Sequence, residues 1–212
     1  MALVLLEELD YMQQYKEDMS LAKYLFHQGR NFETYDYLGS HFCIEDDQEG
    51  FVFRVWAPNA VSVSVVGDFN GWNHQLHPMK KETEEGIWEL FVEGLEEFSL
   101  YKYAVVAKDG RVLFKADPYA FHSETKEKTA SYTYSFKDKF NWTDSDWQKY
   151  KENLNAYESP MNIYEVHLGS WKKADDGQFL NYRVIADELI PYAKKLGYTH
   201  LELLPLAEHP FD

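Results

Sequence analysis

Apolar and polar residues alternate along the first half of the chain in a pattern that predicts β-strands. The alternation is clearest in residues 51–56 and 61–65, where every second position is apolar, as expected for strands with one buried face. Further strands are expected at residues 86–92 and 101–106, and the Asp109-Gly110 pair predicts a hairpin turn into residues 111–114. Several short strands separated by turn residues are typical of an antiparallel β-sandwich.

A helical period precedes these strands. From about Leu5 to Gln28, the apolar residues Leu5, Leu9 and Met12 recur at spacings of four and three, and Gly29 is a suitable stop. The sequence therefore predicts an amino-terminal helix with one apolar face.

The pattern changes again after Pro160. Residues 161–168 form an apolar run that predicts a strand, and residues 199–206 form a second one. Between them, Asn181 is placed to cap a helix that Gly197 ends. A strand, a helix and a strand at this spacing predict a βαβ unit with parallel strands.

The helix of this unit carries an apolar stripe and one unfavourable residue. Ile185, Leu189, Tyr192 and Leu196 share a face. Pro191 lies inside the predicted helix, where it is expected to kink the helix or to shift its boundary.

The segment between the two patterned regions has no clear period. Residues 116–160 mix polar and aromatic side chains, and we interpret them as a linker that packs on its neighbours, because exposed aromatic rings are costly. The predicted layout is therefore a helical lead, a β-sandwich, the linker and a βαβ unit, at residues 1–36, 37–115, 116–160 and 161–212.

Composition and charge exclude several kinds of partner. A net charge of −15 argues against nucleic acid and anionic membranes, which need clustered Lys and Arg. The first residues lack the basic start of a signal peptide and are too short an apolar run to span a membrane. A single cysteine, Cys43, excludes an internal disulfide and is consistent with a reducing, cytoplasmic location.

Five motifs give the sequence a family resemblance: residues 53–60, 66–73, 115–121, 163–171 and 202–212. In this order they resemble the amino-terminal part of bacterial 1,4-α-glucan (glycogen) branching enzymes, from about Tyr37 to the end. The resemblance implies a mainly β fold: an immunoglobulin-like β-sandwich of the glycogen-binding type, followed by the first βαβ of a truncated (β/α)8 barrel. Glycogen debranching enzymes carry a similar sandwich, but Tyr164–Trp171 together with Glu208–Asp212 favours the branching enzymes.

The resemblance also implies a chemistry. Branching enzymes cut an α-1,4 linkage and transfer the chain to a 6-hydroxyl with retention, which requires a nucleophilic carboxylate and an acid/base carboxyl group. In the family these groups belong to later barrel strands, so none is expected at or before Asp212 and this polypeptide alone is predicted to be inactive. Two further hypotheses remain: a stand-alone α-glucan-binding module, and a scaffold that positions a catalytic barrel.

Two residues align with sugar-binding positions of related glycogen-binding modules. Trp72 can stack on a glucose ring with its N–H bonding outward, or it can be a core aromatic that anchors its turn. Lys102 can donate to sugar hydroxyls, or it can be a solvated strand lysine. Two features of those modules are missing: Val112 occupies the place of a second tryptophan, and Ala116–Tyr119 the place of a ligand-clamping loop.

Four further residues are expected at the active-site end of the barrel: His167, Glu208, His209 and Asp212. Structural support of the cleft is the favoured role over direct contact with substrate. The histidines lack metal-ligand spacing, so neither a metal nor another cofactor is expected. The expected partner is α-glucan (glycogen or malto-oligosaccharide), and the exposed barrel strands would permit self-association.

Overall fold

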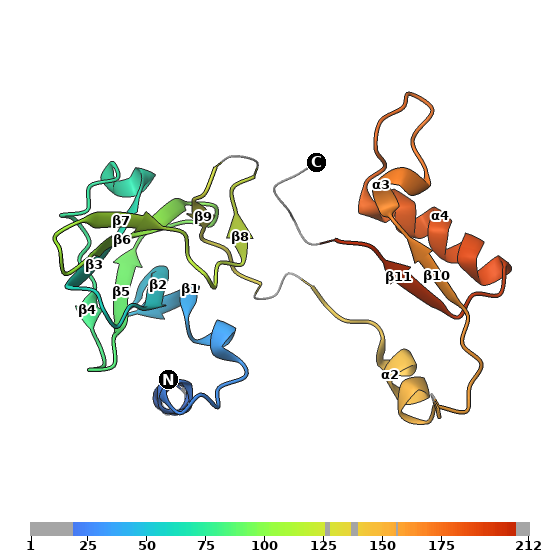
Figure 1. Ribbon diagram of the computed structural model, residues 1–212, viewed down its shortest axis with the longest axis horizontal. Coiled ribbons are helices and arrows are strands. Elements are labelled where there is room, and N and C mark those ends of the chain that lie inside the picture. Colours follow the sequence, from blue (N-terminus) through green and yellow to red (C-terminus); the bar gives the residue numbers. More distant parts are fainter. Residues whose placement is uncertain (1–18, 126–127, 137–139, 156, 207–212) are drawn as a thin grey trace, which may run out of the picture. The chain divides into compact units, whose positions relative to one another are not determined.

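The structure is a computed structural model that describes residues 19–125, 128–136, 140–155 and 157–206. It divides into two compact units, residues 1–139 and 140–212 (Figure 1). Within the described residues, no helix is long and apolar enough to cross a membrane.

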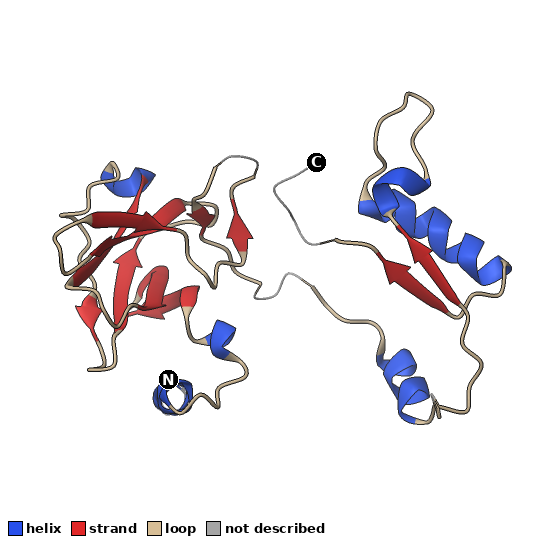
Figure 2. Cartoon of the chain, viewed as in Figure 1, coloured by secondary structure: helices blue, strands red, loops and turns tan. Residues whose placement is uncertain are grey.

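The first unit contains two antiparallel sheets (Figure 2). The four-stranded sheet has the order β1-β2-β5-β4, with β1 Gly39–Glu45, β2 Gln48–Trp56, β4 Lys80–Lys81 and β5 Ile87–Glu93. The five-stranded sheet has the order β3-β6-β9-β8 with β7 also paired to β6; its strands are β3 Ser62–Gly67, β6 Leu100–Val106, β7 Val112–Lys115, β8 His122–Ser123 and β9 Ser131–Tyr132. Two 3-10 turns also belong to this unit, η1 Thr34–Asp36 and η2 Asp68–Asn70.

The two sheets face one another across an apolar core, which confirms the predicted sandwich. The core residues alternate along their strands, because every second side chain of a strand points to the same face. Phe53 of β2 and Tyr101 of β6 are fully buried, and their ring centroids lie 4.9 Å apart. The other members of this core are Phe51, Val55, Val63, Val65, Met79, Trp88, Val92 and Tyr103.

The first strand was not expected from the sequence. β1 pairs with β2 along its whole length, from Gly39↔Arg54 to Glu45↔Gln48. The connecting residues Asp46 and Asp47 have φ values of 48° and 64°, the left-handed pair of a tight two-residue hairpin. Aspartate tolerates this conformation better than most residues do.

The sheet also extends into the segment that we interpreted as a linker. Tyr132 of β9 pairs with Leu100 of β6, and His122 of β8 pairs with Tyr132. Both strands have only two residues, which is too short to produce an alternating pattern in the sequence. The five-stranded sheet therefore continues beyond residue 115.

A buried carboxylate ties this extension to the core. Asp117 is 6% exposed, and its Oδ2 accepts hydrogen bonds from the Tyr101 hydroxyl at 2.7 Å and the Tyr103 hydroxyl at 3.0 Å. Its Oδ1 accepts from the Tyr119 N–H at 2.8 Å, and its own N–H donates to Ser131 Oγ at 3.0 Å. Burial raises the pKa of Asp117 despite these hydrogen bonds, which favour the charged form.

The amino-terminal helix packs on the four-stranded sheet. Its described part, residues 19–27, ends as predicted at Gly29, whose φ is 65°. Phe26 packs against the cluster that includes Leu38 and Ile87. Leu5, Leu9 and Met12, on which the helix prediction rested, lie outside the described residues.

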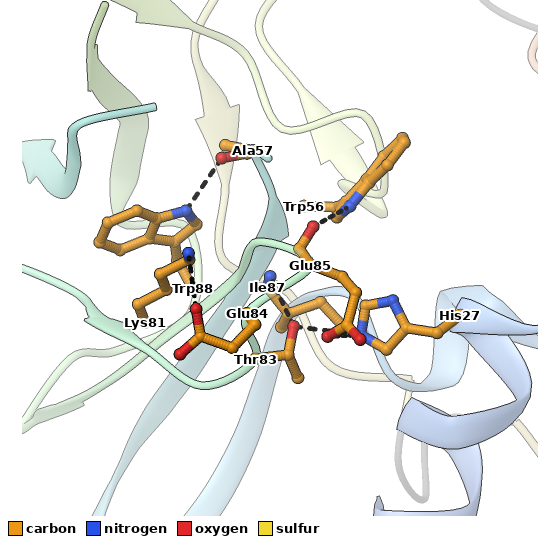
Figure 3. A network of polar contacts seen from close by, with 9 residues as sticks. All are labelled: His27, Trp56, Ala57, Lys81, Thr83, Glu84, Glu85, Ile87 and Trp88. Carbon is orange, nitrogen blue, oxygen red and sulfur yellow. Dashed lines mark hydrogen bonds and ion pairs between the residues drawn. The ribbon is translucent and has the colours of Figure 1, made fainter. Parts of the chain in front are cut away.

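Polar contacts secure the same helix to the β4–β5 turn (Figure 3). His27 Nε2 lies 3.1 Å from Thr83 Oγ1, and the same hydroxyl accepts the Ile87 N–H at 3.1 Å. The indole N–H of Trp56 donates to the Glu85 carbonyl at 2.9 Å (Figure 3). Thr83 therefore links the helix to the first residue of β5.

The second unit contains the predicted βαβ arrangement. β10 Ile163–Val166 and β11 His200–Leu203 are parallel, with Ile163 opposite His200, and α4 Tyr182–Lys195 connects them. Both strands are shorter than the predicted runs. Two more helices belong to this unit, α2 Ser145–Glu152 and α3 Leu168–Trp171.

Helix α4 confirms its predicted cap and differs in its buried face. Ile185 and Leu189 are buried as expected, but Tyr192 and Leu196 are exposed, and Ala193 continues the buried stripe instead. The helix runs through Pro191 to Lys195, so the proline does not shift its boundary.

Loss of the α4 cap is expected to destabilise the first turn of the helix. Asn181 Oδ1 accepts the Val184 N–H at 3.0 Å, and Asn181→Ala should cost about 1 kcal/mol, because that N–H loses its partner. Hydrogen exchange of the α4 amides would measure the loss as faster exchange. The matched control is Asp144→Ala, since Asp144 precedes α2 without making a side-chain cap. Equal effects of the two variants would contradict the assigned role of Asn181.

Candidate functional site

Trp72 lies in a turn that follows β3 and is held by its own side chains. Asn70 Oδ1 accepts the Gly67 N–H at 3.0 Å, while its amide donates to the Val65 carbonyl at 2.9 Å and to His77 Nδ1 at 3.0 Å. The Trp72 N–H donates to the Gly67 carbonyl at 2.9 Å. Trp72 has a φ of 59°, an unusual value for a bulky residue that this network stabilises.

The indole N–H of Trp72 is already occupied. It donates to Asp68 Oδ1 at 2.7 Å, in contrast to the outward-pointing N–H that we expected from the sequence. The side chain is half-buried and belongs to none of the apolar core clusters described above. The arrangement fixes the indole and leaves ring surface, but not its N–H, available for contact.

Lys102 lies next to this turn in the sheet. Lys102 pairs with Val66, and the next pair along the two strands is Tyr101 with Gly67. The carbonyl of Gly67 accepts the backbone N–H of Trp72, so the turn begins one residue pair from Lys102. Since Tyr101 and Tyr103 point into the core, Lys102 points to the outer face of the five-stranded sheet. Its ammonium donates to Thr129 Oγ1 at 2.7 Å.

Thr129 is a candidate site residue that sequence reasoning missed. It lies two residues before β9, is exposed and meets Lys102 through its hydroxyl. A lone threonine in an unpatterned segment gives no signal in the sequence. The segment therefore contributes a side chain near Lys102, although we expected the clamping loop of related modules to be absent.

Phe114 is a second residue that the sequence did not identify. The register of β6 and β7 pairs it with Ala104, so Phe114 shares the outer face with Lys102 and lies diagonal to it. Its side chain is 47% exposed. An exposed aromatic ring thus lies beside Lys102, although Val112 occupies the place of the second tryptophan of related glycogen-binding modules.

Of the residues predicted for the active-site end of the second unit, His167 is the one that the described structure includes. His167 follows β10 and is exposed, and its Nδ1 lies 3.1 Å from Ser170 Oγ. Glu208, His209 and Asp212 lie outside the described residues. Among the residues that are described, no three His, Cys, Asp or Glu side chains are grouped so that they could hold a metal ion.

Part of the first unit is similar to a known family of domains. Residues 37–120 match carbohydrate-binding module 48, the isoamylase N-terminal domain. The matched range contains Trp72, Lys102 and Phe114. Thr129 and β9 follow it in the chain.

Curated relatives match most of the chain. It is 50% identical over 192 residues to a 1,4-alpha-glucan branching enzyme of Bacillus caldolyticus, which covers 91% of this chain and 29% of that enzyme. A branching enzyme of Halothermothrix orenii is 47% identical over 190 residues, with 90% and 30% covered. The chain therefore corresponds to a portion of these enzymes that makes up somewhat less than a third of their length.

Solved structures share the fold at lower identity. A putative alpha amylase of Salmonella typhimurium has a TM-score of 0.55 at 23% identity, covering 81% of this chain and 25% of that protein. A Klebsiella pneumoniae pullulanase complexed with maltotriose has a TM-score of 0.55 at 23% identity, covering 84% and 18%. At this identity the likeness shows the fold alone.

Proposed function

We propose that this chain binds α-glucan as part of a 1,4-α-glucan branching enzyme, because residues 37–120 match carbohydrate-binding module 48 and most of the chain is similar to a portion of such enzymes. The enzyme would act in the cytoplasm, cutting α-1,4 links and making α-1,6 branches. The chain spans about 29% of the length of such a relative, and we expect it to have no branching activity by itself.

The outer face around Lys102 carries this proposal. An ammonium and a hydroxyl 2.7 Å apart offer hydrogen bonds to sugar hydroxyls, and an exposed ring at Phe114 offers apolar surface on the same face. Trp72 adds a fixed indole at the adjoining turn. A few polar groups beside aromatic surface suit a neutral, ring-shaped ligand, and the charge of −15 disfavours a polyanion.

Calorimetric titration with maltoheptaose and β-cyclodextrin tests the proposal. We expect saturable binding with a Kd of about 0.1–1 mM, a range suited to an open surface site of few contacts. A flat titration from a folded protein would contradict glucan binding. It would favour the scaffold role, in which the sandwich positions a catalytic barrel.

Replacement of Lys102 is expected to weaken the site without unfolding it. Lys102→Met keeps much of the aliphatic stem and removes the ammonium, so the maltoheptaose Kd should rise roughly fivefold through loss of charge-assisted hydrogen bonds. The control is Lys80→Met, since Lys80 is exposed and lies on the other sheet. An equal loss in both variants would indicate an effect of net charge and would remove Lys102 from the site.

For the second unit, we propose a place in a larger parallel sheet. Ile163, Leu201 and Leu203 of the paired strands are 47%, 36% and 39% exposed. Apolar strands of parallel sheets are normally covered on both faces. Their exposure supports the view that β10 and β11 begin a (β/α)8 barrel whose other strands cover them; a second copy of the chain is the alternative cover.

A further inference from the structure

We propose that the glucan-binding surface extends beyond Lys102 to an aromatic group formed by Tyr132, His122 and Phe98, which provides a further subsite for longer α-glucans. The inference rests on the proposed α-glucan binding. It adds how far the binding surface extends and toward which strands. It follows from the part of the five-stranded sheet that continues past residue 115 (Figure 1).

The register places this group on the same face as Lys102. Leu100 and Lys102 lie two residues apart on β6 and point outward together. Tyr132 pairs with Leu100, and paired residues of antiparallel strands share a face, so Tyr132 also points outward. His122 pairs with Tyr132 and extends the row by one strand.

Lys102 is consequently flanked by two aromatic residues along one edge of β6. Phe114 of β7 lies opposite Ala104, two residues after Lys102. Tyr132 of β9 lies opposite Leu100, two residues before Lys102. The four-residue offset between Ala104 and Leu100 corresponds to about 13 Å of strand. This distance exceeds one sugar ring, so a single glucose unit at Lys102 would not reach both aromatic residues.

The rings at the far end support one another. Phe98 lies with its ring centroid 5.4 Å from His122 and 6.3 Å from Tyr132, and the centroids of His122 and Tyr132 are 5.3 Å apart, all in edge-to-face arrangements. Phe98 is 53% exposed and has a φ of 62°, a strained conformation that the fold maintains in a solvent-facing aromatic residue. His122 is also exposed.

The chemistry of this group favours a neutral sugar chain. The rings offer apolar surface, while the phenol of Tyr132 and the imidazole of His122 can donate or accept hydrogen bonds with hydroxyl groups. The group shares the sheet face with Lys102 and Thr129, so a chain bound there can continue onto it. A short oligosaccharide would occupy the surface near Lys102, and a longer one would reach His122.

The test compares two ligands by calorimetry, maltotriose and maltoheptaose. In the double variant Tyr132→Ala/His122→Ala, we expect the maltoheptaose Kd to rise about fivefold and the maltotriose Kd to rise less, because a short chain at Lys102 can reach Tyr132 but not His122. The single variant His122→Ala, which changes an exposed side chain, should show the same selective loss to a smaller degree. The matched control is Phe42→Ala, an exposed aromatic of β1 on the other sheet.

The outcomes separate this inference from the proposed function. An equal loss for both ligands would show that Tyr132 and His122 merely support the surface near Lys102, and it would overturn the extension; so would no loss for either. A wild-type protein that binds neither ligand would refute the proposed function itself. A second readout is the NMR signal of the His122 ring, which should shift with maltoheptaose and not with maltotriose.

Discussion

The Trp72→Ala variant should lose measurable binding to maltoheptaose and β-cyclodextrin. A fixed aromatic ring is the kind of residue that dominates a small binding surface, and its removal is expected to raise the Kd at least tenfold, which is about 1.4 kcal/mol. From a starting Kd near ~1 mM, such a change leaves no saturable titration. Calorimetry would show it as heats that do not differ from dilution.

The control is Trp142→Ala. Trp142 is 80% exposed and belongs to the second unit, so its loss should leave glucan binding unchanged. Trp72→Phe keeps a flat ring but removes the N–H that Asp68 accepts, and intermediate affinity is expected. Wild-type affinity in Trp72→Ala, with an unchanged melting temperature, would exclude Trp72 from the site and favour its role as an anchor of the turn.

The Asp117→Ala variant should be strongly destabilised. The substitution leaves the hydroxyls of Tyr101 and Tyr103 and the N–H of Tyr119 without the carboxylate that accepts all three. Buried donors without partners cost about 1–3 kcal/mol each, and partial rescue by Ser40 Oγ, 3.1 Å from the Tyr101 hydroxyl, reduces the sum. We expect a loss of about 2–4 kcal/mol in urea unfolding of the sandwich. Asp109→Ala removes exposed contacts with the N–H and guanidinium of Arg111 and should cost less, about 1 kcal/mol at most.

The same carboxylate predicts a pH dependence with a defined sign. Burial raises the pKa of Asp117, so the folded state binds the proton more tightly than the unfolded state does. The stabilisation is complete below the ordinary aspartate pKa and is lost as the pH rises through the raised value. In Asp117→Asn this contribution is absent. The stability of the wild type relative to that variant should therefore increase from neutral pH to about pH 4; a constant difference would show that Asp117 does not titrate in this way.

The alternating pattern predicted most of the sandwich, because β2, β3 and β6 each place an apolar residue at every second position to form the core between the two sheets. β1 escaped notice, because its large apolar residues at alternate positions are only Phe42 and Ile44, which is too short a run to predict a strand. β8 and β9 are too short to have a period, and they are defined by tertiary pairing with β6. Helix α4 was predictable down to its cap, because Asn181 acts through its immediate neighbours.

The candidate site was predictable only in part. Trp72 and Lys102 stand in or near recognisable motifs. Thr129 becomes a candidate through a contact across 27 positions of the chain, and Phe114 through the strand register, neither of which local sequence reveals. The partner of the Trp72 indole was likewise hidden, although Asp68 lies only four residues away.

The occupied indole N–H of Trp72 has a consequence for selectivity. Because the indole N–H already donates to Asp68, the exposed ring surface of Trp72 has no free hydrogen-bond donor. The ring can therefore select a flat sugar face but cannot distinguish the pattern of the sugar hydroxyls. Deoxy sugars should therefore be tolerated where they meet Trp72, whereas an epimer with an axial hydroxyl on the stacked face should not. Recognition of the hydroxyl pattern of a hexose would fall to Lys102 and Thr129.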